Sequence, residues 1–261
     1  MKMLRLLILL TLWVGRPICF CAENKYDVLG KVLTPFFQVV TKQTKNPNRA
    51  FTLALQLEAM TDLPPQWKGA RAEVALQYPD KLRLSGPVFG EQLIVCRNGQ
   101  EIWAYPGSKV DALIEEARLA KKLPPPDKKV RLEPFSLPVP EKQLVLLPVL
   151  FQVADAGREE IDGETCRVLD VQLMPEIARS LGATEWMARL WVRPDYHPAR
   201  VIVHRPGWLA TVRVDDVQFA PALPESTWQP TPEQASDVAK ISPARYQQLL
   251  KLIGGKAGGS S

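Results

Sequence analysis

The sequence predicts an α+β protein built on a strongly curved antiparallel β-sheet, with helices on one side of the sheet. Residues 26–43 place apolar side chains in pairs about four apart, which is the spacing of one helical face. From residue 51 onward the apolar period changes to two, as in half-buried strands. Short turns such as Asn98-Gly99 and Asp162-Gly163 join these strands, and strands joined so closely must pair antiparallel.

The helix over residues 26–43 contains Pro35, which we expect to kink it or to divide it into two short helices, because proline lacks the amide donor. Alternation predicts strands at residues 51–58, 72–78, 82–84, 92–97, 100–105, 158–161, 165–173, 186–193, 200–205 and 209–219.

The alternating pattern breaks between residues 107 and 148, where a helix-like stretch and several prolines predict an insertion or a loop packed on the surface. Within and just after it, residues 144–151 are apolar and predict either a short core helix or the lip of a pocket. We therefore expect one domain over residues 23–230 that carries this insertion. Residues 231–261 follow as a helix-prone segment and a tail of flexible composition.

The first 22 residues have the parts of an export signal in the right order. A basic start precedes the apolar run from Leu6 to Val14, which is too short to span a bilayer because spanning needs about 20 apolar residues. We expect cleavage near Ala22 and a periplasmic mature protein. A lipid-anchored start at Cys21 is less favoured, since Phe20 stands where lipoprotein processing needs a small residue.

The charge of the mature chain argues against nucleic acid as a partner. Three of the 33 basic residues lie in the leader, so 30 remain against 28 acidic residues, a formal charge of +2. No cluster of lysine and arginine follows one periodic face, and a nucleic-acid binder needs such a cluster.

The mature chain keeps two cysteines, Cys96 and Cys166, in a compartment that permits disulfides. We leave two alternatives open, a Cys96–Cys166 bridge or two buried free thiols. Their spacing fits no metal pattern, and the chain has only two histidines. We expect no metal site and no cofactor.

Residue types that catalyse hydrolysis are sparse. The chain has no Gly-x-Ser-x-Gly elbow, and His197 and His204 lie in a predicted turn and a predicted strand. Acidic pairs such as Glu159-Glu160 are adjacent, so on a strand they point to opposite faces and cannot share a proton. We expect a protein that is not an enzyme.

Several short motifs resemble the LolA-like family of periplasmic lipoprotein carriers and the broader group of outer-membrane lipoprotein-sorting proteins. The central likeness comprises Tyr78-Pro79-Asp80-Lys81-Leu82-Arg83-Leu84, Asn98-Gly99 and Trp103-Ala104-Tyr105. Later segments that are similar are Ile161-Asp162-Gly163, Trp191-Val192-Arg193-Pro194 and Leu223-Pro224-Glu225-Ser226-Thr227-Trp228.

The resemblance implies a half-open barrel whose apolar groove holds the acyl chains of a lipoprotein or lipid. It implies a chaperone in outer-membrane biogenesis, with inner- and outer-membrane sorting proteins as further partners. We expect the groove to be lined by Phe36, Phe37, Leu53, Leu55, Leu57, Val74, Leu76, Leu82, Leu84, Ile102, Trp103 and Trp191.

The carriers of this family have a basic residue before the strand-ending proline, where it ties the helical lid to the sheet. This sequence has Tyr78 there, and we expect its hydroxyl to make the lid contact instead. The alternative function is a regulatory or sensory envelope domain of the same fold that binds a protein partner. A secreted hydrolase is the third alternative.

Overall fold

The structure is a computed structural model that describes residues 23–42, 44–61, 65–88, 91–119, 130–137, 140–180 and 182–249. Within these ranges eleven strands form one sheet, and all neighbouring strands pair antiparallel. The strands are β1 (Ala50–Met60), β2 (Arg71–Gln77), β3 (Lys81–Val88), β4 (Glu91–Asn98), β5 (Glu101–Tyr105), β6 (Phe151–Ile161), β7 (Glu164–Leu173), β8 (Met187–Val192), β9 (Pro198–Arg205), β10 (Trp208–Ala220) and β11 (Ala239–Lys240).

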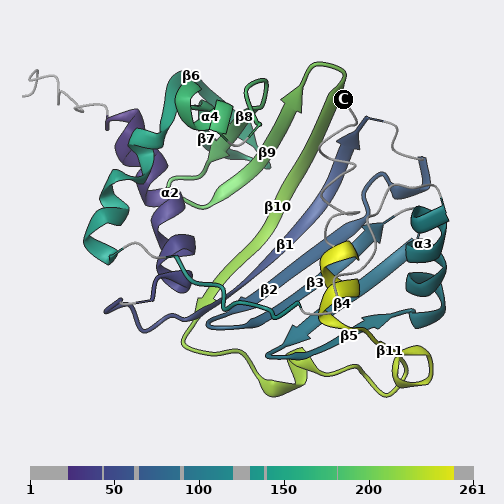
Figure 1. Cartoon of the computed structure of the whole chain (residues 1–261). Helices are drawn as coiled ribbons and strands as arrows, with labels where there is room; N and C mark the ends of the chain where they lie inside the picture. The colour runs from purple at the N-terminus through teal and green to yellow at the C-terminus, as the bar shows by residue number, and fades with distance from the viewer. Residues whose placement is uncertain are drawn as a thin grey trace, which may run out of the picture.

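Two meanders make up this sheet. The order across it is β11-β5-β4-β3-β2-β1-β10-β9-β8-β7-β6, so consecutive strands are neighbours everywhere except at the β1–β10 and β11–β5 pairs. The two long strands β1 and β10 lie side by side in the middle of the sheet (Figure 1). Strand β1 thus joins the first meander to the second.

Helices lie on both flanks of the sheet. The described helices are α2 (Lys25–Val40), α3 (Gly107–Leu119), α4 (Pro175–Ser180), the 3-10 helices η1 (Pro65–Trp67), η2 (Glu141–Leu150), η3 (Glu225–Trp228) and η4 (Ala235–Asp237), and a last helical stretch at residues 243–249. Figure 1 shows α2 at one flank, α3 at the other, and the last stretch, in yellow, in front of β3 and β4. The predicted α+β fold, with a curved antiparallel sheet and helices over it, is confirmed.

Helix α2 begins with a side-chain cap, because Asn24 Oδ1 accepts a 3.0 Å hydrogen bond from the amide of Tyr26. We expected Pro35 to kink the helix or to divide it, and the helix continues through Pro35, so the division does not occur. Val32 and Val39 are buried on either side of the proline. Their packing holds both halves in place and offsets the donor that Pro35 lacks.

Alternation gives the sheet an inner face, which carries α2 and α3, and an outer face. Under α2, the inner face forms a core of Val28, Leu29, Val32, Val153, Leu169, Val171 and Val192. Under α3 and the last helical stretch, it forms a second core of Leu93, Val95, Ile102, Ala104, Val110, Ile114, Leu132, Ile241, Tyr246 and Leu249. The two covers lie over opposite ends of the sheet and leave its centre between them.

The segment after β10 packs on the outer face. Trp228 of η3 is 1 % exposed and lies in a cluster with Ala75, Ile94, Cys96 and Trp103. Burial of an indole of this size removes a large apolar area from water. The outer face of β4 and β5 is therefore also covered.

Three predicted segments differ from what was expected. Strand β6 starts at Phe151, whereas the predicted strand starts at residue 158. The prediction missed the first part of the strand because most of its side chains are exposed and show no apolar alternation. Helix α3 lies in the predicted insertion, yet its Val110 and Ile114 belong to the core. Residues 144–150 form part of η2, where Leu144 is buried and several apolar side chains face solvent.

Cys96 and Cys166 are both buried free thiols, so the alternative of a bridge is ruled out. They lie on β4 and β7, with six strands between them. At about 4.8 Å per strand this separation is on the order of 30 Å, far beyond the roughly 6 Å that a disulfide spans. Burial raises the pKa of the Cys96 thiol to about 12.

No helix in the ranges that the structure describes has the length and hydrophobicity needed to cross a membrane. The predicted leader, residues 1–22, and residues 250–261 lie outside the described residues.

Candidate functional site

The centre of the inner face is an apolar floor that none of the described helices covers completely. Leu53 of β1 lies opposite Val74 of β2 on one side and opposite Val217 of β10 on the other. Following the same register, the floor comprises Phe51, Leu53, Leu55, Leu57, Val74, Leu76, Leu82, Leu84, Val201, Val203, Val212, Val214, Val217 and Phe219. All of these side chains are apolar, and all but Val214 are only partly buried.

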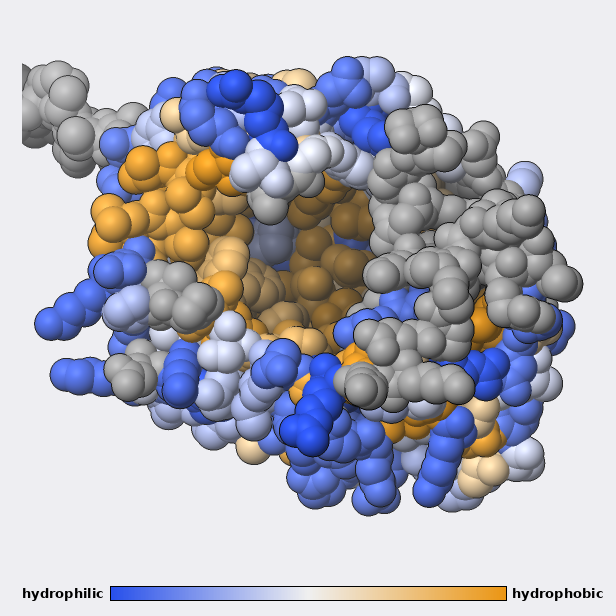
Figure 2. Space-filling view, in the orientation of Figure 1, coloured by the Kyte–Doolittle hydropathy of each residue, from blue (hydrophilic) through white to orange (hydrophobic). Residues whose placement is uncertain are grey.

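Figure 2 shows a hollow in the molecule with a hydrophobic floor, seen from the side of the inner face. Along β10 the floor extends from Phe219 to Val212, about 23 Å at the rise of a β-strand, and Trp208 lies beyond it on the same face. We call this hollow, with its floor, the inner groove. Its shape and chemistry suit a long apolar ligand.

An aromatic cluster closes one end of the inner groove. Phe36 of α2 makes edge-on contacts with Phe51 and Phe219, with ring centroids 5.3 Å and 5.1 Å apart. Helix α2 thus reaches the floor where β1 begins and β10 ends. Phe37, the next residue, is partly buried, and its carbonyl accepts a hydrogen bond from the Thr41 hydroxyl.

The other end of the groove carries two tryptophans and an arginine that sequence analysis did not select. Trp208 lies opposite Arg205 in the β9–β10 hairpin, and both share the inner face with Val203. The ring centroids of Trp186 and Trp208 lie 5.3 Å apart. The Arg205 guanidinium lies 5.2 Å from the centroid of the Trp186 ring. The sequence does contain a signal for Arg205, because its period-two spacing from Val201 and Val203 places it on the same face of β9.

The end of α2 is tied to the sheet by Arg49, which the sequence did not single out. Arg49 Nη1 donates to the carbonyls of Gln38, at 3.3 Å, and Thr41, at 2.9 Å. The Arg49 guanidinium lies 3.9 Å from the ring centroid of Tyr78. Tyr78, the predicted lid contact, is therefore linked to α2 indirectly. Its ring face packs against Arg49, and Arg49 binds the end of the helix.

Trp103 and Trp191, selected for the groove, lie on the outer face instead. The Trp103 indole donates a 2.9 Å hydrogen bond to the Trp228 carbonyl, within the cluster of the outer face. The Trp191 indole donates a 2.8 Å hydrogen bond to Glu159. Ile102 faces inward but is 3 % exposed beneath α3, so it is a core residue.

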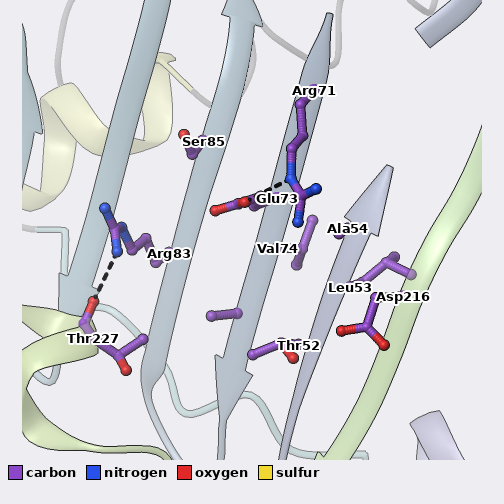
Figure 3. Close-up of a pocket in the computed structure, with 11 residues that line it drawn as sticks. Thr52, Leu53, Ala54, Arg71, Glu73, Val74, Arg83, Ser85, Asp216 and Thr227 are labelled. Carbon is purple, nitrogen blue, oxygen red and sulfur yellow. Dashed lines mark hydrogen bonds and ion pairs between the residues drawn. The ribbon is translucent and has the colours of Figure 1, made fainter. Parts of the chain in front are cut away.

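A polar hollow of about 200 Å³ lies on the outer face of β1, β2 and β3 (Figure 3). There Arg71 Nε pairs with Glu73 at 2.9 Å, and Arg83 donates to the Thr227 carbonyl at 3.5 Å. Asp216 also lines it. Because both signs of charge are present and partly neutralise each other, the hollow offers neither a strong ion site nor an apolar one.

The remaining ion pairs of the central strands are also away from the floor. Arg189 donates to Asp170, at 2.6 Å and 2.8 Å, and this lowers the pKa of Asp170. On the outer side of β9, Arg200 pairs with Glu58 at 2.8 Å. The floor itself is uncharged.

The histidines form no catalytic arrangement with the described residues. His197 Nδ1 lies 3.1 Å from Asp195 in an exposed turn, and His204 faces outward between Met187 and Leu209. In the part of the chain that the structure describes, no three His, Cys, Asp or Glu side chains are placed to hold a metal ion.

The fold and the groove together define a structural class, a curved antiparallel sheet with an apolar groove on its inner face. No protein-family model and no curated protein sequence matches the chain. Similar solved structures include a LolA superfamily protein from Nitrosomonas europaea, with 13% identity, a TM-score of 0.30, and coverage of 80% of this chain and 99% of that one.

Two further similar structures come from other bacteria. The MucA/MucB complex of Pseudomonas aeruginosa matches with 15% identity, a TM-score of 0.43 and 83% coverage of this chain, which spans 63% of the matched chain. The Mycobacterium tuberculosis lipoprotein LppX matches with 10% identity, a TM-score of 0.39, and coverage of 77% of this chain and 99% of that one. These low identities and TM-scores do not identify a ligand or a partner for this chain.

Proposed function

We propose that the protein is a periplasmic carrier that holds the acyl chains of a lipid or lipoprotein in the inner groove. The observation that supports this most is the uncharged floor on β1, β10 and the strands beside them, where every leucine and every valine except Val214 remains partly exposed. A continuous apolar surface that stays in water is a common mark of a binding site. Periplasmic location rests on the leader, and membrane sorting proteins would be the partners that load and unload such a carrier.

The energetics favour an acyl ligand. Burial of a methylene contributes about 0.8 kcal/mol, so one long chain supplies on the order of 10 kcal/mol before the cost of ordering it. The floor has no polar group that such a chain would leave unpaired. Affinity should therefore rise with chain length, and this rise should barely respond to salt, because apolar burial is not screened.

The test uses two neighbours on β1 that face opposite ways. Leu53→Asp places an unpaired charge in the inner groove, whereas Thr52→Asp places the same charge in the polar hollow outside. We expect Leu53→Asp to weaken the binding of long-chain fatty acids at least tenfold and Thr52→Asp to leave it unchanged. Circular dichroism and the urea midpoint show whether each variant folds.

Equal binding by the two variants would argue against the groove as the site. Absence of binding by the wild-type protein at every chain length would argue against the carrier function itself. Mass spectrometry of natively purified protein provides a second check, since a carrier should retain bound lipid.

The regulatory alternative has one observation in its favour. Helix η2 exposes Val145, Leu146 and Val149, which are 75%, 57% and 65% accessible. Such a patch is typical of a protein-binding surface. A stable protein complex in native mass spectrometry, lost on changing Val145 and Val149 to serine, would favour a domain that binds a protein partner.

A further inference from the structure

The end of the inner groove beside Trp208 carries a positive charge that has no carboxylate partner among the described residues. Four arginines lie on β8, β9 and β10. Arg189 pairs with Asp170, Arg200 with Glu58 and Arg213 with Asp215. Arg205, the fourth, forms no ion pair with a residue that the structure describes.

Arg205 is also held in a fixed place. Its guanidinium lies against the Trp186 ring, which in turn contacts Trp208 edge to face. Its Nε is shielded from solvent, and no described residue accepts a hydrogen bond from it. A buried donor without an acceptor is unfavourable, so an acceptor supplied by a ligand would be bound with a gain.

The position of Arg205 relates it to the floor. Arg205 follows Val201 and Val203 at period two, and Trp208 continues the row of Val212 and Ala210. The guanidinium therefore stands at the end of the apolar floor, on the same face, opposite the end that Phe36 closes.

We propose that Arg205, flanked by Trp186 and Trp208, binds the anionic headgroup of an amphiphile whose chain lies along the inner groove. This rests on the proposed function and specifies its ligand: a lipid with a carboxylate or phosphate headgroup. Guanidinium binds both groups through paired N–H donors, and tryptophan suits the boundary between apolar chain and water. The chain then points from Arg205 toward Phe36.

The first experiment compares laurate, dodecanol and dodecyl phosphate, which share a chain and differ in the headgroup. Wild-type protein should bind the anions about tenfold more tightly than the alcohol. Arg205→Gln should remove this preference while binding dodecanol as the wild type does, and Arg205→Lys should retain part of it. Arg71→Gln, on the outer face, is the matched control and should keep the full preference.

The outcomes separate the two proposals. If no dodecyl compound binds, the carrier function fails. If all three bind equally, or if Arg205→Gln retains the preference, the headgroup site is overturned and the groove stands. Tighter binding of laurate indicates a fatty acid as the natural ligand, and tighter binding of dodecyl phosphate indicates a phospholipid.

The second experiment tests the direction of the chain. Bromine quenches indole fluorescence only at close contact, so fatty acids brominated near the carboxylate should quench Trp186 and Trp208, and those brominated near the methyl end should not. Trp208→Phe should reduce this quenching. Trp103 and Trp191 lie on the outer face and should not respond. Stronger quenching by the methyl-end bromines would reverse the direction and overturn the proposal.

Discussion

Replacing Arg49 by alanine should release the end of α2 from the sheet. The variant loses two hydrogen bonds from a charged donor to the carbonyls of Gln38 and Thr41, and the contact with the Tyr78 ring. Hydrogen bonds to charged groups contribute about 1.5–3 kcal/mol each, and a partly exposed cation–π contact about 0.5–1 kcal/mol. Water can replace part of this at a helix end, so we expect a loss of about 3 kcal/mol in the free energy of unfolding.

Urea denaturation followed by circular dichroism measures this loss. Arg49→Lys should lose about half as much, because an ammonium keeps the charge but not the planar fork. Arg71→Ala, which removes an exposed pair, should change stability by less than about 0.5 kcal/mol. Amide exchange should accelerate most over residues 36–42.

The reasoning would be refuted if Arg49→Ala and Arg71→Ala had the same unfolding midpoint. It would also be refuted if Arg49→Ala destabilised the protein without faster exchange at the end of α2. The first result would show that Arg49 carries no net stabilisation, and the second that its effect lies elsewhere.

Three further predictions concern the thiols, acid and the leader. Cys96 and Cys166 should resist iodoacetamide at pH 8 in the native protein and react fully in urea, because burial raises the pKa of both thiols. Arg189 lowers the pKa of Asp170 below its ordinary 3.8, so the pair's contribution, about 1 kcal/mol or less, is present above about pH 4. It is lost as pH falls through the lower pKa, and Asp170→Asn should weaken the acid dependence of the urea midpoint. The intact mass of denatured protein from the periplasmic fraction should correspond to a chain that starts near Ala22 and has no covalently attached diacylglyceryl group.

Much of the fold followed from period-two alternation. Each of the ten predicted strand positions lies on an observed strand, since most half-buried strands show their apolar face in the sequence. Strand β6 was the exception in length, because an edge strand with exposed side chains has no such face. Leu53, Leu55 and Leu57 alternate with other residues along β1. Because successive side chains of a strand point to opposite faces, all three lie on the inner face.

The errors in the site have more than one cause. Alternation shows which residues share a face but not which face is concave, and Ile102 and Trp103, as neighbours on β5, cannot both line a groove. Arg49 and Arg205 were missed because their partners lie on distant segments. Register across several strands was needed to place them.

The pairing of β1 with β10 has a consequence for how the protein reaches its working state. Each meander contains contacts between residues close in the chain, whereas this pair joins Ala50 to Ala220. Long-range pairings form late because they close a large loop, so the two meanders should form first and meet last. The floor of the inner groove lies across that junction. On the proposed function, the chain should therefore gain its ability to bind an acyl ligand only after the two meanders have paired.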